Sequence, residues 1–175
     1  GHAVWCARHL IGSEPVAILL ADDLILGASC VKEMADAYNG GNMIAVMDVP
    51  HEQTGSYGIV TPGADDGRIV QVEGLVEKPD PSSAPSNIAV VGRYIVTPGV
   101  FETLAAQEHG AGGEIQLTDA LAKQIGKAPF SGVRFSGERF DCGSKLGFLQ
   151  ANVAFGLNNG AMRDQLRDWL GERLG

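Results

Sequence analysis

The sequence predicts an α/β fold in which a mixed, mostly parallel sheet carries helices on both faces. Short apolar runs alternate along the chain with segments of helical periodicity, and one pair of extended segments is joined by a tight turn. No stretch has the length and composition of a linker, so residues 1–175 are expected to form a single domain.

Strands are expected where apolar runs end at turn residues. Pro15–Leu20 is continuously apolar, which is typical of a strand covered on both faces, and it ends at a pair of aspartates. A strand is expected to begin at Tyr57–Val60 and to end at a turn over residues 64–67. Residues 68–76 are expected to form the next extended segment, as its hairpin partner. The other expected strands are Asn42–Val49, Ile88–Val96 and Val133–Phe135.

Helices are expected between these strands and over residues 146–175 at the end of the chain. Ser29 is a candidate N-cap for the second helix, a proline begins the third, and the last helix is amphipathic. The expected helices are Gly1–Leu10, Ser29–Tyr38, Pro98–Gln107, Ile115–Ile125, Leu146–Leu157 and Met162–Leu174.

Composition argues against several classes of function. The net charge of −8 argues against nucleic acid as a partner, because phosphate backbones are bound by clustered Lys and Arg. No apolar stretch approaches the roughly 20 residues that span a bilayer, and no secretory signal is recognisable, so we expect no membrane partner and a cytoplasmic location. The three cysteines and four histidines lack ligand spacing, which disfavours a disulfide framework or a zinc site.

Carboxylates next to expected secondary structure form the first candidate site. Asp22 and Asp23 follow a strand at its C-terminal end, where open α/β sheets bind ligands. Such carboxylates suit Mg²⁺ held jointly with phosphates, although an aspartate there can also cap the next turn. Asp141 precedes a glycine-containing turn and a helix, so it is either a second metal ligand or the N-cap of that helix.

A second candidate site is the tripeptide Glu77-Lys78-Pro79. A glutamate can accept hydrogen bonds from two adjacent sugar hydroxyls, and a lysine can neutralise a phosphate as a point charge. The same tripeptide is also common on protein surfaces. Gly58, inside an expected strand, indicates either close approach of the backbone to a ligand or a bulge. No Ser-His-Asp or Cys-His pattern is evident, so no side-chain nucleophile is expected.

Six segments together resemble the bacterial UTP–glucose-1-phosphate uridylyltransferases in their order and spacing. They are GHAVWCA, LLADDLI, SYGIV, VEKPDPSSAPSNIAVVGRYI, GGEIQLTDAL and FDCGSKLGFLQA. The resemblance runs across nearly the whole chain, and its last two segments are more specific than the sugar nucleotidylyltransferases in general. It implies a Rossmann-like nucleotide-diphosphosugar transferase fold that is incomplete at the N-terminus.

The resemblance implies an enzyme that joins UTP and glucose 1-phosphate to give UDP-glucose and pyrophosphate. The sugar phosphate would attack the α-phosphorus of UTP in line, with Mg²⁺ as cofactor. By the same resemblance, Asp22 and Asp141 ligate Mg²⁺, Glu77 holds sugar hydroxyls and Lys78 holds the phosphates. Lys78 and Asp22 would be the catalytic residues.

The resemblance also assigns secondary roles and an assembly state. The backbones of Gly58 and Val90 would line the sugar pocket, Asn87 would help to shape it, and Lys145 would contact phosphate. Members of the family commonly form dimers or tetramers, so a homo-oligomer is expected.

The chain departs from the family's pattern at its start. The family begins with a strand and a Gly-rich loop that cradles the triphosphate through backbone N–H groups. Gly1-His2-Ala3 corresponds to a point well inside the family's sequence, just after residues that would contact uracil. The resemblance therefore implies that the first part of the enzyme is missing and that this chain alone is inactive. It also implies an uncovered sheet edge that makes the chain unstable or prone to associate.

Three other functions fit parts of the sequence. A non-catalytic paralogue that binds a UDP-sugar would keep the fold and lose the chemistry, whereas Asp22, Glu77, Lys78 and Asp141 are all present. A metal-dependent glycosyltransferase would use Asp22 and Asp23 as its metal motif and would not release pyrophosphate. Another sugar-1-phosphate nucleotidylyltransferase would use the same chemistry on a different sugar.

Overall fold

The computed structural model describes residues 1–106 and 108–175, and contacts divide them into two compact units. Unit 1 comprises Gly1–Leu19 and Cys30–Phe135, and unit 2 comprises Leu20–Ser29 and Ser136–Gly175. Each unit is therefore assembled from two separate stretches of chain. The prediction of a single domain over 1–175 stays a prediction.

Unit 1 is built on a mixed sheet. In the described part this sheet has six strands in the order β1-β6-β3-β7-β5-β4, and β4 also pairs with β6. The strands are β1 (Val16–Leu19), β3 (Asn42–Asp48), β4 (Gly58–Asp65), β5 (Ile69–Glu77), β6 (Ile88–Val96) and β7 (Phe130–Arg134).

The strand directions confirm a mixed sheet, but parallel neighbours are fewer than the sequence predicts. Among the described strands, β3 and β7 pair in parallel, and the other neighbours pair antiparallel. The reason is that β6 lies between β1 and β3 and runs opposite to both, so strands that share a direction are separated. β4 and β5 form the expected hairpin.

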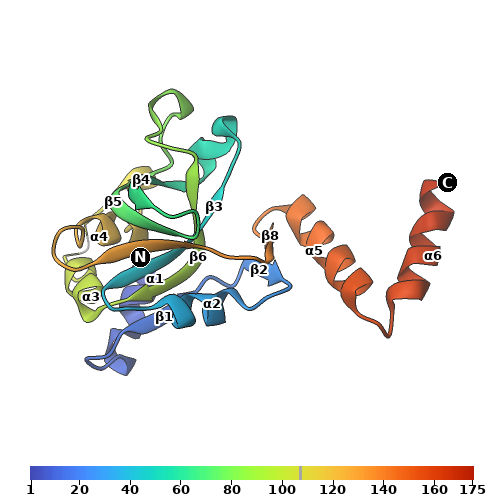
Figure 1. The fold of residues 1–175 in the computed structure, drawn as a ribbon, viewed down its shortest axis with the longest axis horizontal. Coiled ribbons are helices and arrows are strands. Elements are labelled where there is room, and N and C mark those ends of the chain that lie inside the picture. The colour runs from blue at the N-terminus through green and yellow to red at the C-terminus, as the bar shows by residue number, and fades with distance from the viewer. Residues whose placement is uncertain (107) are drawn as a thin grey trace. The chain divides into compact units, whose positions relative to one another are not determined.

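Helices lie on both faces of this sheet, as predicted (Figure 1). Residues of α3 and α4 pack with Ile88, Tyr94 and Val96 of β6 in the main apolar core, and Trp5 of α1 packs against it. α2 contacts β3 and β6 and buries Met34, which lies outside that core. The helical segments of unit 1 are α1 (His2–Cys6), η1 (Ala7–Leu10), α2 (Cys30–Ala37), η2 (His51–Ser56), η3 (Pro81–Ser83), α3 (Pro98–Leu104), η4 (Ala111–Gly113) and α4 (Leu117–Ala122).

Several predicted elements differ from the structure in extent or burial. The strand predicted for Val133–Phe135 is β7, which begins at Phe130 and ends at Arg134, and the helix predicted for Gly1–Leu10 is divided into α1 and η1. β1 is not covered on both faces: Leu19 is 53% exposed, because β1 ends the sheet and its side chains alternate between partly buried and exposed positions. The helix predicted for Ile115–Ile125 shortens to α4. The helix predicted for Pro98–Gln107 ends at Leu104, and its predicted last residue lies outside the described residues.

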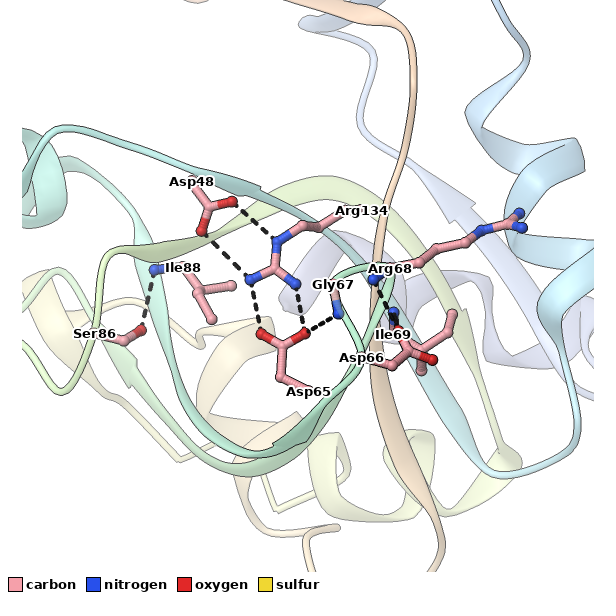
Figure 2. Close-up of polar contacts among 9 residues, drawn as sticks. All are labelled: Asp48, Asp65, Asp66, Gly67, Arg68, Ile69, Ser86, Ile88 and Arg134. Atoms are coloured by element: carbon pink, nitrogen blue, oxygen red, sulfur yellow. Dashed lines mark hydrogen bonds and ion pairs between the residues drawn. The ribbon is translucent and has the colours of Figure 1, made fainter.

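An arginine connects three strands of the unit 1 sheet (Figure 2). Arg134 at the end of β7 donates through Nε to Asp48 Oδ2 at 3.0 Å, and through Nη1 to Asp65 Oδ1 at 2.9 Å. These bonds link β7 to the ends of β3 and β4. The bond from Arg134 is the main cause that lowers the pKa of the Asp65 carboxyl below its ordinary value.

Unit 2 consists of a small sheet and a helical hairpin (Figure 1). β2 (Asp23–Leu26) pairs antiparallel with β8 (Glu138–Asp141), and α5 (Lys145–Asn158) is followed by α6 (Arg163–Leu174). A Cβ on Gly156 would press on the side chain of Leu166, so the two helices approach closely at this glycine. The sequence predicts both helices but neither strand. No described helix is long and apolar enough to cross a membrane.

Candidate functional site

The first group of candidate residues meets at the start of β4 in unit 1. Gly58 and Glu77 are cross-strand partners in the β4–β5 hairpin, and the Glu77 side chain is 12% exposed. A Cβ placed on Gly58 would lie 3.2 Å from Glu77 Oε2 and 3.3 Å from Thr118 Oγ1. The carboxylate of Glu77 and the hydroxyl of Thr118 therefore converge over a glycine that leaves room for both.

Lys78, which follows Glu77 in the chain, has a strained backbone. Its φ is +46°, and among the described residues it is the one non-glycine residue with a positive φ. The conformation is also unusual because the residue before a proline is normally extended. Strain of this kind costs of order 1–3 kcal/mol and concentrates at functional sites.

Two backbone and side-chain contacts fix the position of Lys78. Its N–H donates to Tyr57 O at 2.9 Å, which ties it to the residue before Gly58. Its ammonium is exposed and lies 3.9 Å from Glu77 Oε1. The ammonium therefore lies within ion-pair distance of the Glu77 carboxylate and remains exposed.

Asn87 and Val90 lie on the other side of β4. Ile59 of β4 pairs with Ala89 of β6, between these two residues. The Asn87 carbonyl accepts from Val49 N at 3.0 Å, and the Asn87 side chain is exposed. Val90 packs partly against the main core. The predicted sugar-pocket residues of unit 1 thus occupy the adjoining strands β5, β4 and β6.

The second group of candidate residues lies in unit 2. Asp22 is exposed in the turn before β2, and its carbonyl accepts from Cys142 N at 2.7 Å. Asp141 ends β8, and its Oδ1 accepts from the N–H of Gly143 at 3.0 Å. A Cβ on Gly143 would lie 3.0 Å from Asp141 Oδ1 and 3.4 Å from Asp22 Oδ2. Two carboxylates that are distant in the sequence therefore converge on one glycine.

The neighbouring Asp23 has a different role. It is 4% exposed, forms an ion pair with Arg139, and is the cross-strand partner of Asp141. Its buried carboxylate is engaged in holding β2 and β8 together, so the metal-ligand hypothesis applies to Asp22 rather than to Asp23.

The residues around the start of α5 resolve one alternative. Ser144 is the N-cap of α5, and its hydroxyl accepts from Gly147 N at 3.0 Å. The interpretation of Asp141 as the cap of this helix is therefore wrong, which leaves its carboxylate directed at Gly143. Lys145, the first residue of α5, is exposed.

The carboxylates of Asp22 and Asp141 fit a shared Mg²⁺ site better than a complete protein cage. No group of three or more His, Cys, Asp or Glu side chains in the described ranges is arranged to hold a metal. Mg²⁺ typically takes one or two carboxylates and fills its other positions with water and substrate phosphates. Two converging carboxylates satisfy that requirement.

Sequence reasoning missed Thr118 and Gly143. Thr118 lies in the segment GGEIQLTDAL and Gly143 in DCGSKLGF, both of which support the resemblance. Nothing in the spacing of those segments indicates that they approach Gly58 or Asp22, because these contacts join parts of the chain that are distant in sequence.

A family model for nucleotidyl transferases matches residues 1–156 of the chain. The chain belongs to the nucleotidyl transferase family. The chain is 53% identical over 172 residues to a UTP–glucose-1-phosphate uridylyltransferase of Komagataeibacter xylinus, and the match covers 97% of the chain and 58% of that relative. The chain thus spans little more than half of that relative's length.

Solved structures agree with the sequence relatives. A UDP-glucose pyrophosphorylase complexed with UDP-glucose superposes with a TM-score of 0.85 at 37% identity, covering 90% of this chain and 62% of that one. A UTP-bound UGPase from Acinetobacter baumannii superposes with a TM-score of 0.83 at 32% identity, covering 98% and 61%. The α/β fold and the homology predicted from the six segments are confirmed.

Proposed function

We propose that this chain provides the sugar-phosphate and metal side of an enzyme that joins UTP and glucose 1-phosphate into UDP-glucose and pyrophosphate. The observation that carries the proposal is the 53% identity over 172 residues to a relative named for that reaction. The groups around Gly58 and Gly143 support it, because one offers acceptors for sugar hydroxyls and the other offers oxygen ligands for a cation.

Glu77 is the residue that we expect to bind the sugar. An ionised carboxylate has acceptor capacity for two adjacent hydroxyls, and this one is mostly buried beside Gly58. In this proposal the backbones of Gly58 and Val90 line the pocket, and Asn87 shapes its rim. A rigid pocket of this kind would orient the phosphate of glucose 1-phosphate for in-line attack.

Lys78 offsets the repulsion between the two anionic reactants. Both substrates carry phosphates, so a fixed cation between them stabilises the approach and the charge that develops during transfer. The constrained backbone of Lys78 supports this role, because it limits the directions in which the ammonium can point. Lys145, exposed at the start of α5, is a second contact for phosphate in this proposal.

Asp22 and Asp141 would hold Mg²⁺, with Asp22 counted among the catalytic residues. When bound, the ion would neutralise phosphate charge and orient the phosphates. The hydrogen bond from the Gly143 N–H orients the Asp141 carboxylate, and the missing Cβ of Gly143 keeps the space between the two carboxylates open.

The proposal extends to partners and location. We propose a homo-oligomer, either a dimer or a tetramer, that acts in the cytoplasm, where UTP is made, and that binds neither nucleic acid nor membrane. Exposed apolar residues on α5 and α6 support self-association, since burying them against a second copy would be favourable. They include Leu146, Phe148, Leu149, Trp169 and Leu174.

A chimaeric enzyme tests the proposed reaction. This chain would replace the matching segment of the K. xylinus relative, and pyrophosphate release would be measured with UTP and glucose 1-phosphate. We expect turnover that depends on both substrates and falls at least 100-fold with Lys78→Ala, as removal of a charge-stabilising group predicts. A folded chimaera that releases no pyrophosphate, or one that is indifferent to Lys78→Ala, would refute the assignment.

A further inference from the structure

Ser86 lies directly before Asn87 in the loop between η3 and β6, and it makes two hydrogen bonds. Its hydroxyl donates to Val60 O of β4 at 2.6 Å. The same oxygen accepts from the N–H of Ile88, the first residue of β6, at 3.0 Å (Figure 2). A single partly buried hydroxyl therefore joins the start of β6 to the middle of β4.

This link matters because β4 and β6, although they pack in the same apolar cores, have a short ladder. Their ladder in the described chain consists of one pair, Ile59 with Ala89. Val60, the acceptor of the Ser86 hydroxyl, follows Ile59 and lies two positions from Gly58 on the same strand. The Ser86 bond is thus a second tie between the strand that carries Gly58 and the strand that carries Val90.

Asn87 is consequently fixed from two sides. The residue before it is bound to β4 through the Ser86 hydroxyl, and its own carbonyl accepts from Val49 N after β3. Asp48, the cross-strand partner of Ile88, is in turn held by Arg134 (Figure 2). The backbone on either side of Asn87 therefore has little freedom relative to Gly58.

We propose that Ser86 is a positioning residue of the sugar pocket, which fixes the backbone from Asn87 to Val90 at a set distance from Gly58. This inference rests on the proposed function, because it assumes that these backbones line a sugar site. Ser86 acts through Asn87 and Val90 and needs no contact with substrate. Its bond to Ile88 alone would be an ordinary local serine turn, and the long-range bond to Val60 gives it the second role.

The test compares three variants of the chain. Ser86→Ala removes the hydroxyl and leaves the Ile88 N–H and the Val60 carbonyl without this partner. Ser86→Thr keeps the hydroxyl. Ser83→Ala is the matched control, because Ser83 is exposed at the end of η3 and its hydroxyl donates locally to Asp80 O at 3.0 Å.

Two readouts are needed, namely hydrogen exchange of the Ile88 amide and calorimetric affinity for UDP-glucose. With Ser86→Ala we expect the Ile88 amide to exchange about tenfold faster and the Kd for UDP-glucose to rise about five- to tenfold. Ser86→Thr and Ser83→Ala should stay within about twofold of the wild type in both the exchange rate and the Kd. A twofold change corresponds to a free-energy difference of about 0.4 kcal/mol.

The outcomes separate this inference from the proposed function. If the wild-type chain binds UDP-glucose and Ser86→Ala binds it equally well, the positioning role is wrong, even where exchange at Ile88 is faster. Failure of Ser86→Thr to restore binding would also overturn it, since the hydroxyl would not be the operative group. If the wild-type chain binds no UDP-glucose, the proposed function of this chain fails first, and the positioning role falls with it.

Discussion

Lys78 combines a strained backbone with an exposed ammonium, and replacing it with glycine should change stability and ligand binding in opposite directions. Glycine adopts a positive φ without steric penalty, so Lys78→Gly should stabilise the fold while removing the proposed phosphate contact. Lys78→Ala should lose the same contact and keep the strain.

The magnitude follows from two opposing contributions. Relief of the left-handed conformation is worth about 1–2 kcal/mol, and the greater flexibility of glycine in the unfolded chain takes back about 0.5–1 kcal/mol. The net gain of up to about 1.5 kcal/mol corresponds to a rise in Tm of up to about 6 °C for a chain of this size. Loss of a charged hydrogen bond to phosphate, worth about 1.5–3 kcal/mol, should weaken UDP-glucose binding about 10- to 100-fold.

Thermal melts followed by circular dichroism and titration calorimetry with UDP-glucose measure the two effects. Lys127→Gly is a suitable control, because Lys127 is exposed and is not among the described residues with a positive φ. It should lower stability by about 0.4–1 kcal/mol, because glycine is more flexible in the unfolded chain. The reasoning about strain is refuted if Lys78→Gly melts below Lys78→Ala. The reasoning about the phosphate contact is refuted if both variants bind like the wild type.

Three further predictions concern Gly143, Gly58 and the ion pair between Arg134 and Asp65. Gly143→Ala should weaken the Mg²⁺-dependent binding of UDP-glucose, whereas Gly160→Ala, whose Cβ would meet nothing within 4 Å, should bind normally. Equal calorimetric behaviour of the two variants would contradict the metal assignment. Gly58→Ala should weaken UDP-glucose binding at least tenfold with a small change in Tm, because the added Cβ would crowd the Glu77 carboxylate. A large fall in Tm with intact binding would count against a ligand pocket at Gly58. Hydrogen bonding to Arg134 lowers the pKa of the Asp65 carboxyl in the folded state, so the stability that this carboxylate contributes is present above about pH 4 and is lost as the pH falls further. In urea melts, the difference in stability between the wild type and Asp65→Asn should therefore shrink below that pH. A difference that stays constant with pH would exclude this linkage.

Much of the fold can be predicted from local sequence, because the signals are local. Ile88–Val96 is a strand over the predicted residues, and the turn before Ile69 correctly joins β4 to β5. The strands β2 and β8 were missed because each is four residues long, and they pair segments that no short turn connects. The position of β4 beside β6 could not be predicted either, because no short turn connects these two strands.

In the candidate site, too, local features could be predicted from the sequence and long-range contacts could not. Asp22 and Asp141 could be singled out because each lies at an element boundary, but their meeting at Gly143 depends on the pairing of β2 with β8. The conformation of Lys78 could not be predicted, since a residue before proline is expected to be extended. The role of Ser86 likewise depends on a hydrogen bond to a different strand.

Calorimetric titration of this chain with UDP-glucose, in Mg²⁺ and then in excess EDTA, tests the central claim most directly. The account predicts binding that requires Mg²⁺, that weakens at least tenfold with Asp22→Asn, and that exceeds the binding of UTP. Absence of UDP-glucose binding in Mg²⁺, or binding that is equally strong in EDTA and unaffected by Asp22→Asn, would contradict the claim that these residues form a sugar-phosphate and metal site.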